Sequence, residues 1–376
     1  YGSDKRLFHV VESLKSMGCD VVYGAKHVSG LETVDDRLRL PKVGVRAVTP
    51  LADGEEILRE QVERLMRYGR ARSHPFDMVI MTLWFWSTTP LPLQLLPLLK
   101  ELSPTSRIAI LSDDVHFMRV RSISSHDRRR ANEVRSEELG VYRGADVVFT
   151  MTEEDKSRIL TAEPSLGAPF IIPLPTVSTS LLVDDPWSKK SEASRDSFES
   201  RSHLIFVGNG ANPVNGLSLK WFLDTTWKRV RKAIPGIELT VIGADWDVDA
   251  KSSDVHFRGF VDEEELSALL EATRVFISPI VGSTGLNTKN ILAMEHGVPL
   301  VTTTLGSDGL HLNGSRTDPA MVADDPQSFT KAIKGLYTDA DAWFLRHIRG
   351  PKHVAEYFTR GRQVAQLQKA FAQLGI

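Results

Sequence analysis

Residue types that could hold phosphate oxygens gather in one stretch of the second half of the chain. The stretch 278–290 combines two glycines, several hydroxyl side chains and, near its end, Lys289. Apolar residues before it predict a strand at 275–278, and the periodicity after it predicts a helix at 288–296. Amides at a helix N-terminus favour an anion, and a lysine adds a mobile positive charge. The pattern therefore predicts an anion-binding loop with candidate contacts Gly282, Ser283, Thr284, Gly285, Asn287, Thr288 and Asn290.

The same stretch also has a purely structural interpretation. Thr288 could cap the helix, with Lys289 simply solvated. The order of residues is not that of a Walker loop, because no Gly-Lys-Ser/Thr sequence follows the first glycine. The strand–loop–helix context favours the anion site over the plain capped helix.

A second, shorter loop, Gly208-Asn209-Gly210-Ala211-Asn212-Pro213, follows a predicted strand at 204–207. Glycines let a ligand approach the backbone, and amides in such a turn can bind phosphate. Gly-Asn-Gly is also an ordinary way for a chain to leave a strand. Phosphate contacts by Gly208, Asn209, Gly210 and Asn212 and simple turn formation are therefore equally favoured.

Short apolar strands alternate with helices on both sides of a polar segment. Such alternation is typical of parallel sheets covered on both faces. The fold class predicted is α/β, with two Rossmann-like doubly wound domains facing a central cleft. The strands are predicted at 19–23, 76–83, 107–111 and 147–150, and then at 204–207, 238–242, 255–257, 275–278 and 299–303.

The predicted domain boundaries follow the change in composition. An N-terminal Rossmann-like domain spans 1–183, an exposed linker 184–203, a C-terminal Rossmann-like domain 204–350, and a helical tail 351–376. A doubly wound domain opens with a strand, whereas this sequence starts in the turn before its first helix. Either the sequence boundary removes that strand, or the strand is supplied from elsewhere.

Composition is that of a globular protein without a nucleic-acid partner. The 376 residues carry a formal net charge of -2, and Cys19 is the only cysteine. No apolar run approaches the ~20 residues of a membrane span, and residues 1–6 do not resemble a signal peptide. A cytoplasmic location is favoured, while the oligomeric state has no sequence signal.

A series of motifs occurs in a fixed order in the second half of the chain. The motifs are Phe206-Val207-Gly208-Asn209, Thr240-Val241-Ile242-Gly243, Phe257–Val261, the loop through Lys289, Met294–Thr303 and Gly306–Leu310. This order resembles glycosyltransferase family 4 and its relatives of GT-B architecture (glycosyl transferases group 1). The resemblance implies that 204–350 is the nucleotide-sugar donor domain and 1–183 the acceptor-side domain. The resemblance extends more weakly to 113–119 and 142–148. It implies transfer of a sugar from a nucleotide-sugar donor, such as a UDP- or GDP-sugar, to a hydroxyl acceptor on a glycan, lipid or protein. It also implies retention of configuration, with neither metal nor cofactor.

The resemblance also assigns residues. The loop from Gly282 to Asn290, which includes Lys289, would face the diphosphate. Preorganised amides and the lysine charge would stabilise the departing diphosphate. His116, at the end of a first-domain strand, would lie near the transferred sugar; a histidine bonded to a backbone carbonyl is the alternative. His116 and Lys289 are thus the catalytic candidates. The base pocket would be lined by Gly243, Phe260 and Val261.

One position departs from the family pattern. The second of the family's paired glutamates, which binds the donor ribose, corresponds to Leu292, and no acid occupies the first position. Glu295 is one helical turn further on and is the candidate substitute. The departure leaves three functions open: a transferase, an inactive GT-B scaffold subunit, or a nucleotide-sugar epimerase.

Charged clusters elsewhere are interpreted conservatively. The segment 245–249 lacks the glycine and glutamate of a calcium loop, so no metal is predicted. The arginines between Arg119 and Arg130 predict a solvated helix face, with an anionic acceptor or a peripheral membrane contact as the alternative.

Overall fold

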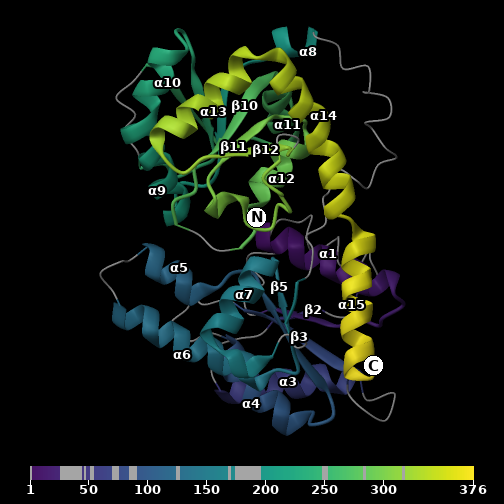
Figure 1. Ribbon diagram of the computed structural model, residues 1–376. Helices are drawn as coiled ribbons and strands as arrows, with labels where there is room; N and C mark the ends of the chain where they lie inside the picture. Colours follow the sequence, from purple (N-terminus) through teal and green to yellow (C-terminus); the bar gives the residue numbers. More distant parts are fainter. Residues whose placement is uncertain are drawn as a thin grey trace. The chain divides into compact units, whose positions relative to one another are not determined.

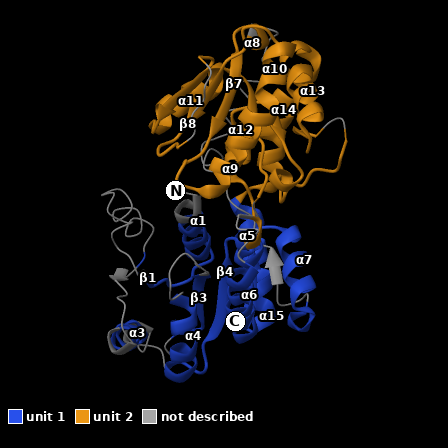
Figure 2. Ribbon diagram, turned by 90° about the vertical axis from the view of Figure 1, so that its left-hand side faces the viewer, with its two compact units in different colours: residues 1–120, 126–177, 360–376 blue, residues 121–125, 178–359 orange. Residues whose placement is uncertain are grey.

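The computed structural model divides into two compact units (Figures 1 and 2). Unit 1 comprises 1–120, 126–177 and 360–376, and unit 2 comprises 121–125 and 178–359. The structure describes residues 2–25, 45, 48–50, 55–69, 76–83, 91–123, 128–167, 171–173, 196–247, 253–282, 285–315 and 318–376. The α/β class with parallel sheets, predicted from the sequence, is confirmed.

Unit 1 is built on a four-stranded parallel sheet in the order β3-β4-β5-β6. Its strands are β3 (Met78–Leu83), β4 (Arg107–Ser112), β5 (Val147–Thr150) and β6 (Ile171–Pro173). A separate parallel pair is formed by β1 (Tyr23–Ala25) and β2 (Val48–Pro50). The strand predicted at 19–23 therefore begins later, at Tyr23. Since β5 is buried along its whole length, both faces of the sheet are covered.

Alternate residues of β4 divide the core of unit 1 into two layers. Ile108 and Ile110 face one layer, and Ala109 and Leu111 face the other, as the two-residue period of a strand requires. The first layer is closed by α3 (Glu55–Gly69), α4 (Leu91–Leu102) and α6 (Arg128–Gly144), and the second by α1 (Gly2–Ser16) and α15 (Arg360–Leu374). The remaining helices are α5 (His116–Ile123), α7 (Glu153–Ala162) and a 3-10 turn at Pro164–Leu166.

The last helix, α15, belongs to unit 1 although it follows unit 2 in sequence. It lies beside α1 (Figure 1). Leu367 and Ala370 pack with Val10 and Leu14 of α1. Ser13 Oγ donates to Gln363 Oε1 at 2.6 Å in the same buried contact. The sequence placed 351–376 in one tail, whereas the structure divides that segment: its first part continues α14 (Ala340–Tyr357) of unit 2, and α15 covers unit 1.

Unit 2 contains a six-stranded parallel sheet in the order β12-β11-β10-β7-β8-β9. The strands are β7 (Ser202–Val207), β8 (Leu239–Ile242), β9 (Val255–Gly259), β10 (Thr273–Ser278), β11 (Leu300–Thr302) and β12 (Ala320–Val322). From β7 the chain builds outward to β9 and then returns to place β10 on the other side of β7. The switch in strand order falls between β7 and β10, the position where such sheets bind ligands.

One long helical stretch of unit 2 is irregular. It consists of α9 (Pro213–Trp221), a π-helical segment (Phe222–Trp227) and α10 (Lys228–Ala233). Of the predicted linker, 184–195 lies outside the described residues, while α8 (Asp196–Glu199) and the start of β7 occupy the rest. The others are α11 (Glu263–Ala272), α12 (Thr288–Glu295), a 3-10 turn (Leu305–Ser307) and α13 (Pro326–Thr338). Across the described residues, no helix is both long and apolar enough to cross a membrane.

Candidate functional site

Three loops meet at the carboxyl edge of the unit 2 sheet. The loop after β7 is bonded to the segment after β8, because Gly208 N–H donates to Ile242 O at 2.9 Å and Gly210 N–H to Ala244 O at 2.8 Å. The segment after β8 is in turn bonded to the end of β9, since Gly243 N–H donates to Gly259 O at 2.7 Å. Strands that neighbour one another in the sheet therefore hold the predicted phosphate and base loops side by side.

Glycines make this close approach of the loops possible. Gly243 has φ of 122°, and a Cβ on it would overlap the carbonyl oxygen of Gly208. A Cβ on Gly210 would likewise overlap the backbone of Asp245. The sequence predicted these glycines as points where a ligand approaches the backbone; the structure shows that they first allow one loop to approach another.

The predicted anion loop ends at α12, whose N-cap is Asn287 rather than Thr288. The Asn287 side chain makes no capping hydrogen bond, and its Nδ2 has no partner among the described residues. Gly285 adopts φ of 77° just before the cap, and Gly282 is buried at the other end of the loop. The amides of the first turn are therefore not capped by the Asn287 side chain, which leaves this helix end suited to an anion. Ser283 and Thr284, two further predicted contacts, lie outside the described residues.

Lys289 joins the two predicted phosphate loops. Its Nζ donates to Asn215 Oδ1 at 2.6 Å, and Asn215 Nδ2 donates to Asn209 O at 2.9 Å. The ammonium also lies 4.7 Å from the ring centroid of Phe206. Removal from water lowers the pKa of Lys289 to about 7. An anion bound beside the ammonium would favour the charged form of the lysine.

Asn215 was not predicted from the sequence. It lies in the first turn of α9, whose N-cap Asn212 accepts from Val214 N–H at 3.1 Å. The sequence signal that could have indicated Asn215 is its position as a polar residue in the first turn of a helix that starts at the predicted loop. Its partner Lys289 is 74 positions away, which no local pattern reveals.

Asn290 is placed differently from the neighbouring candidates. Its side chain is fully buried, and Nδ2 donates to Gly306 O at 2.7 Å. Thr303 Oγ1 supports the same loop by donating to Ile280 O at 2.6 Å. Asn290 therefore fastens the loop after β11 to the first turn of α12.

The nucleotide-side candidates lie at two separate places in unit 2. Phe260 follows Gly259 and is 67% exposed, beside the half-buried Val261, so most of its side chain faces solvent. Glu295, the substitute for the missing ribose-binding acid, is buried in the last turn of α12, about 9 Å along the helix axis from Lys289. The structure therefore brings Gly243 and Phe260 together but does not bring Glu295 to the loop at the start of α12.

His116 belongs to unit 1, where it is the first residue of α5, after the carboxyl end of β4. It is buried, and its Nδ1 lies 3.6 Å from Glu138 Oε1. Asp114 accepts from Arg119 Nη1 at 2.8 Å beside it, and burial raises the pKa of Asp114 to about 6. The ring of His116 therefore faces a carboxylate.

The other charged candidates are largely paired within unit 1. Arg129 and Arg130 form ion pairs with Glu133 on the surface of α6, at 3.0 and 3.6 Å. No group of three His, Cys, Asp or Glu side chains within the described part of the chain is arranged to hold a metal ion.

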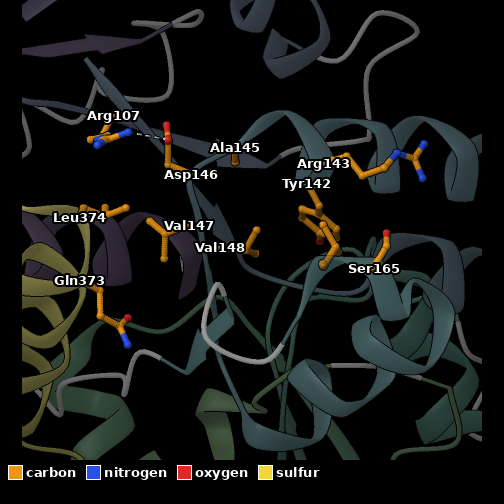
Figure 3. A pocket seen from close by; sticks show the side chains of 11 residues that line it. Arg107, Tyr142, Arg143, Ala145, Asp146, Val147, Val148, Ser165, Gln373 and Leu374 are labelled. Carbon is orange, nitrogen blue, oxygen red and sulfur yellow. Dashed lines mark hydrogen bonds and ion pairs between the residues drawn. The ribbon is translucent and has the colours of Figure 1, made fainter. Parts of the chain in front are cut away.

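A hollow of about 600 Å³ lies on unit 1, at the edge of the sheet where β4 and β5 begin (Figure 3). Arg107 and Asp146, which form an ion pair at 3.3 Å, line it together with Val147 at the start of β5. Leu374 and Gln373 of α15 complete one wall. The hollow is at the amino ends of the strands, away from His116, and was not predicted from the sequence.

Comparison with known proteins agrees with this geometry. Residues 201–339 match the family described as glycosyl transferases group 1. An uncharacterized 44.6 kDa protein of the cps region of Klebsiella pneumoniae is 28% identical over 163 residues, which cover 41% of this chain and 39% of that protein. The protein YtcC of Bacillus subtilis (strain 168) is 25% identical over 197 residues, covering 46% of this chain and 47% of that protein. The chain thus spans less than half the length of these curated relatives.

The fold is similar along nearly the whole chain to Anabaena Alr3699/HepE, a structure solved in complex with UDP-glucose. The TM-score is 0.66 at 12% identity, covering 99% of this chain and 96% of that one. The similarity in fold shows that the chain has the GT-B architecture. More narrowly, the match to glycosyl transferases group 1 lies within unit 2.

Proposed function

We propose that the protein is a glycosyltransferase that moves a sugar from a nucleotide-sugar donor to a hydroxyl acceptor. The observation that carries the proposal is the arrangement around Lys289. Its ammonium lies at the start of α12, beside the loop after β7, at the switch point of a sheet that matches a glycosyl transferase domain. A diphosphate there would meet helix amides, a lysine and glycine-rich backbone at once.

The chemistry of transfer follows from that arrangement. The bond from the anomeric carbon to the diphosphate oxygen breaks, the acceptor oxygen bonds to that carbon, and the hydroxyl proton is released. Negative charge grows on the diphosphate as it leaves, so the fixed amides and Lys289 stabilise the transition state more than the ground state. This device needs no metal and no cofactor. Retention of configuration is the finer proposal, and the family resemblance alone supports it.

The nucleotide end of the donor is assigned to the segments beside this loop. Gly243 and Gly259 hold the ends of β8 and β9 together, and the exposed ring of Phe260 follows. Stacking on an aromatic ring is tolerant of base identity, so a uracil or a guanine base fits this part of the proposal. His116 of unit 1 is proposed to contact the transferred sugar.

Leu292 supports the second candidate, an inactive GT-B subunit that binds without catalysis. The side chain is aliphatic where the family has a ribose-binding carboxylate, and Glu295 is buried at the far end of α12. A structure from Listeria monocytogenes that is described as a UDP-N-acetylglucosamine 2-epimerase has a similar fold, with a TM-score of 0.51 at 10% identity. This similarity concerns the fold alone and does not favour epimerase chemistry.

Product analysis distinguishes these candidates. The protein is incubated with UDP- and GDP-sugars, with and without a panel of glycan, lipid and peptide acceptors. Glycosylated product and free nucleotide diphosphate are expected only when an acceptor is present. An altered sugar on the intact nucleotide, formed without acceptor, would identify an epimerase instead. Donor binding without turnover in any mixture would favour the scaffold subunit.

A further inference from the structure

Glu138 of α6 is a fully buried carboxylate whose two oxygens are both used. Oε1 accepts from the backbone N–H of His116 at 3.1 Å and from the hydroxyl of Tyr142 at 2.7 Å. Oε2 accepts from the backbone N–H of Phe117 at 2.9 Å. The Tyr142 hydroxyl is also 2.7 Å from Ser112 Oγ, at the end of β4. Glu138 is therefore held in one orientation by two other elements of unit 1.

The reason for a carboxylate at this position lies in the start of α5. His116 and Phe117 are its first two residues, so their N–H groups have no acceptor within the helix. A negative charge at a helix N-terminus is favourable, and a buried carboxylate is tolerated only when it is well hydrogen-bonded. Glu138 thus acts as a cap supplied by a different helix.

The same carboxylate faces the imidazole ring of His116. Nδ1 lies 3.6 Å from Glu138 Oε1, an ion-pair distance rather than a hydrogen bond. The other charged groups that act on the ring are Asp114 and Arg119, while the titratable Tyr142 donates to Glu138 Oε1. Burial lowers the pKa of His116, but the bonding and charge of Glu138, aided by Asp114, outweigh burial and raise it overall.

We propose that Glu138 is the positioning residue of the unit 1 site: it fixes the start of α5 and keeps the His116 ring proton on Nδ1, so that Nε2 is the acceptor nitrogen of the neutral ring. A carboxylate behind a histidine sets its tautomer and ring orientation, as it does behind many metal-bound histidines. The assignment of a ligand to Nε2 rests on the proposed function, in which His116 contacts the sugar. The tautomer and the capping of α5 do not depend on it.

The competing explanation is that Glu138 only caps α5 and has no influence on the imidazole ring of His116. Both explanations predict that removing the side chain destabilises unit 1, so stability does not separate them. They differ in the protonation of His116, because only a positioning carboxylate changes the pKa and tautomer of the ring. NMR spectroscopy of the imidazole nitrogens measures both directly.

The first experiment records long-range nitrogen–proton spectra of the full chain, with His116 assigned by comparison with His116→Gln. The neutral ring is expected as the Nδ1–H tautomer in the unmodified protein. The Nε2–H tautomer would overturn the proposal whether or not any variant folds.

The second experiment titrates His116 in Glu138→Gln, which keeps the shape and an acceptor oxygen but removes the charge. The pKa of His116 is expected to fall by about one unit or more. Glu138→Asp should restore most of the shift. The matched control is Glu133→Gln, the same change on the exposed surface of the same helix, with no shift expected. An unchanged His116 pKa in a folded Glu138→Gln protein would contradict positioning.

The pH profile of kcat/KM links the proposal to transfer. The ionisation of the pH profile that is lost in His116→Gln should occur at lower pH in Glu138→Gln. The size of this shift should equal the change in the His116 pKa measured by NMR. A shift by NMR in a protein that transfers no sugar would reject the proposed function and leave the positioning role intact. Sugar transfer with an unchanged pH profile in Glu138→Gln would support the proposed function and reject the positioning role of Glu138.

Discussion

Lys289 is the residue on which the donor side of the account depends. Its Nζ is held 2.6 Å from Asn215 Oδ1, and removal from water lowers its pKa to about 7. Below that pH the lysine is charged, and above it the neutral form dominates in the free protein. A diphosphate binds the charged form, so binding above neutral pH must take up a proton.

Donor affinity should therefore fall as pH rises from about 7, by up to tenfold per pH unit, until the pKa of the bound state is reached. Lys289→Met should remove this slope, because its side chain does not titrate. The affinity at low pH should also drop by about 10- to 100-fold, the value of a hydrogen bond to a charged group. Calorimetry in buffers of different ionisation enthalpy measures the proton uptake. The same slope in Lys289→Met would assign the pH dependence to another group.

At the residue scale, the sequence indicated the loop but not the contacts that organise it. Glycines and hydroxyls before a helix predicted the anion site, and Lys289 was among its residues. Asn215 and Glu138 were missed because each acts on a partner distant in sequence, 74 positions away for Asn215 and 22 for Glu138. Such contacts are set by the order of strands and helices in the sheet layers, which composition does not encode.

At the scale of elements, the glycines that close the loops of unit 2 carry a stability prediction. Gly243→Ala places a Cβ on a backbone with φ of 122° and against Gly208 O. The expected loss in free energy of unfolding is at least about 2 kcal/mol, from strain and displacement of the loop. Chemical denaturation of the full chain measures it.

Two other glycines serve as controls for the loop effect. Gly236 has φ of 79°, but a Cβ there meets no described atom within 4 Å, so Gly236→Ala should cost only about 1 kcal/mol of strain. Gly335 lies inside α13 in open space, and Gly335→Ala should stabilise by about 0.5–1 kcal/mol. Equal losses at Gly243 and Gly236 would show that loop contact adds nothing.

Strands were more predictable than their exact limits. Apolar runs located β3, β4 and β5 in unit 1 and five of the strands of unit 2, because strands buried on both faces are nearly continuous in apolar residues. Three strands of three residues each, β2, β6 and β12, were not predicted, because so short a segment has no clear period. The helix cap was assigned to Thr288 instead of Asn287, an error of one residue typical of helix ends.

At the scale of the whole chain, the return of α15 to unit 1 makes the two ends of the sequence one structural layer. An amphipathic helix has an apolar face, but its sequence does not say which unit covers that face. Leu367 is fully buried against Val10, Leu14 and Phe149, which are all unit 1 residues.

Leu367→Ala should therefore destabilise unit 1 by about 2–5 kcal/mol and leave unit 2 largely unaffected. Hydrogen exchange should become faster in α1, β4 and β5 but not in β7, β8 or β10. The converse is expected for Leu336→Ala, a fully buried leucine of the unit 2 core. Faster exchange in both units with either variant would show that the units unfold together.

Calorimetric titration with a panel of UDP- and GDP-sugars tests the central claim most directly, because that claim is donor binding at the start of α12. The account predicts that at least one donor binds the unmodified chain and binds Lys289→Met at least about tenfold more weakly. Lys334→Met, an exposed lysine of α13, should bind that donor as the unmodified chain does. Absence of binding to every donor, or equal affinity in Lys289→Met, would contradict the account.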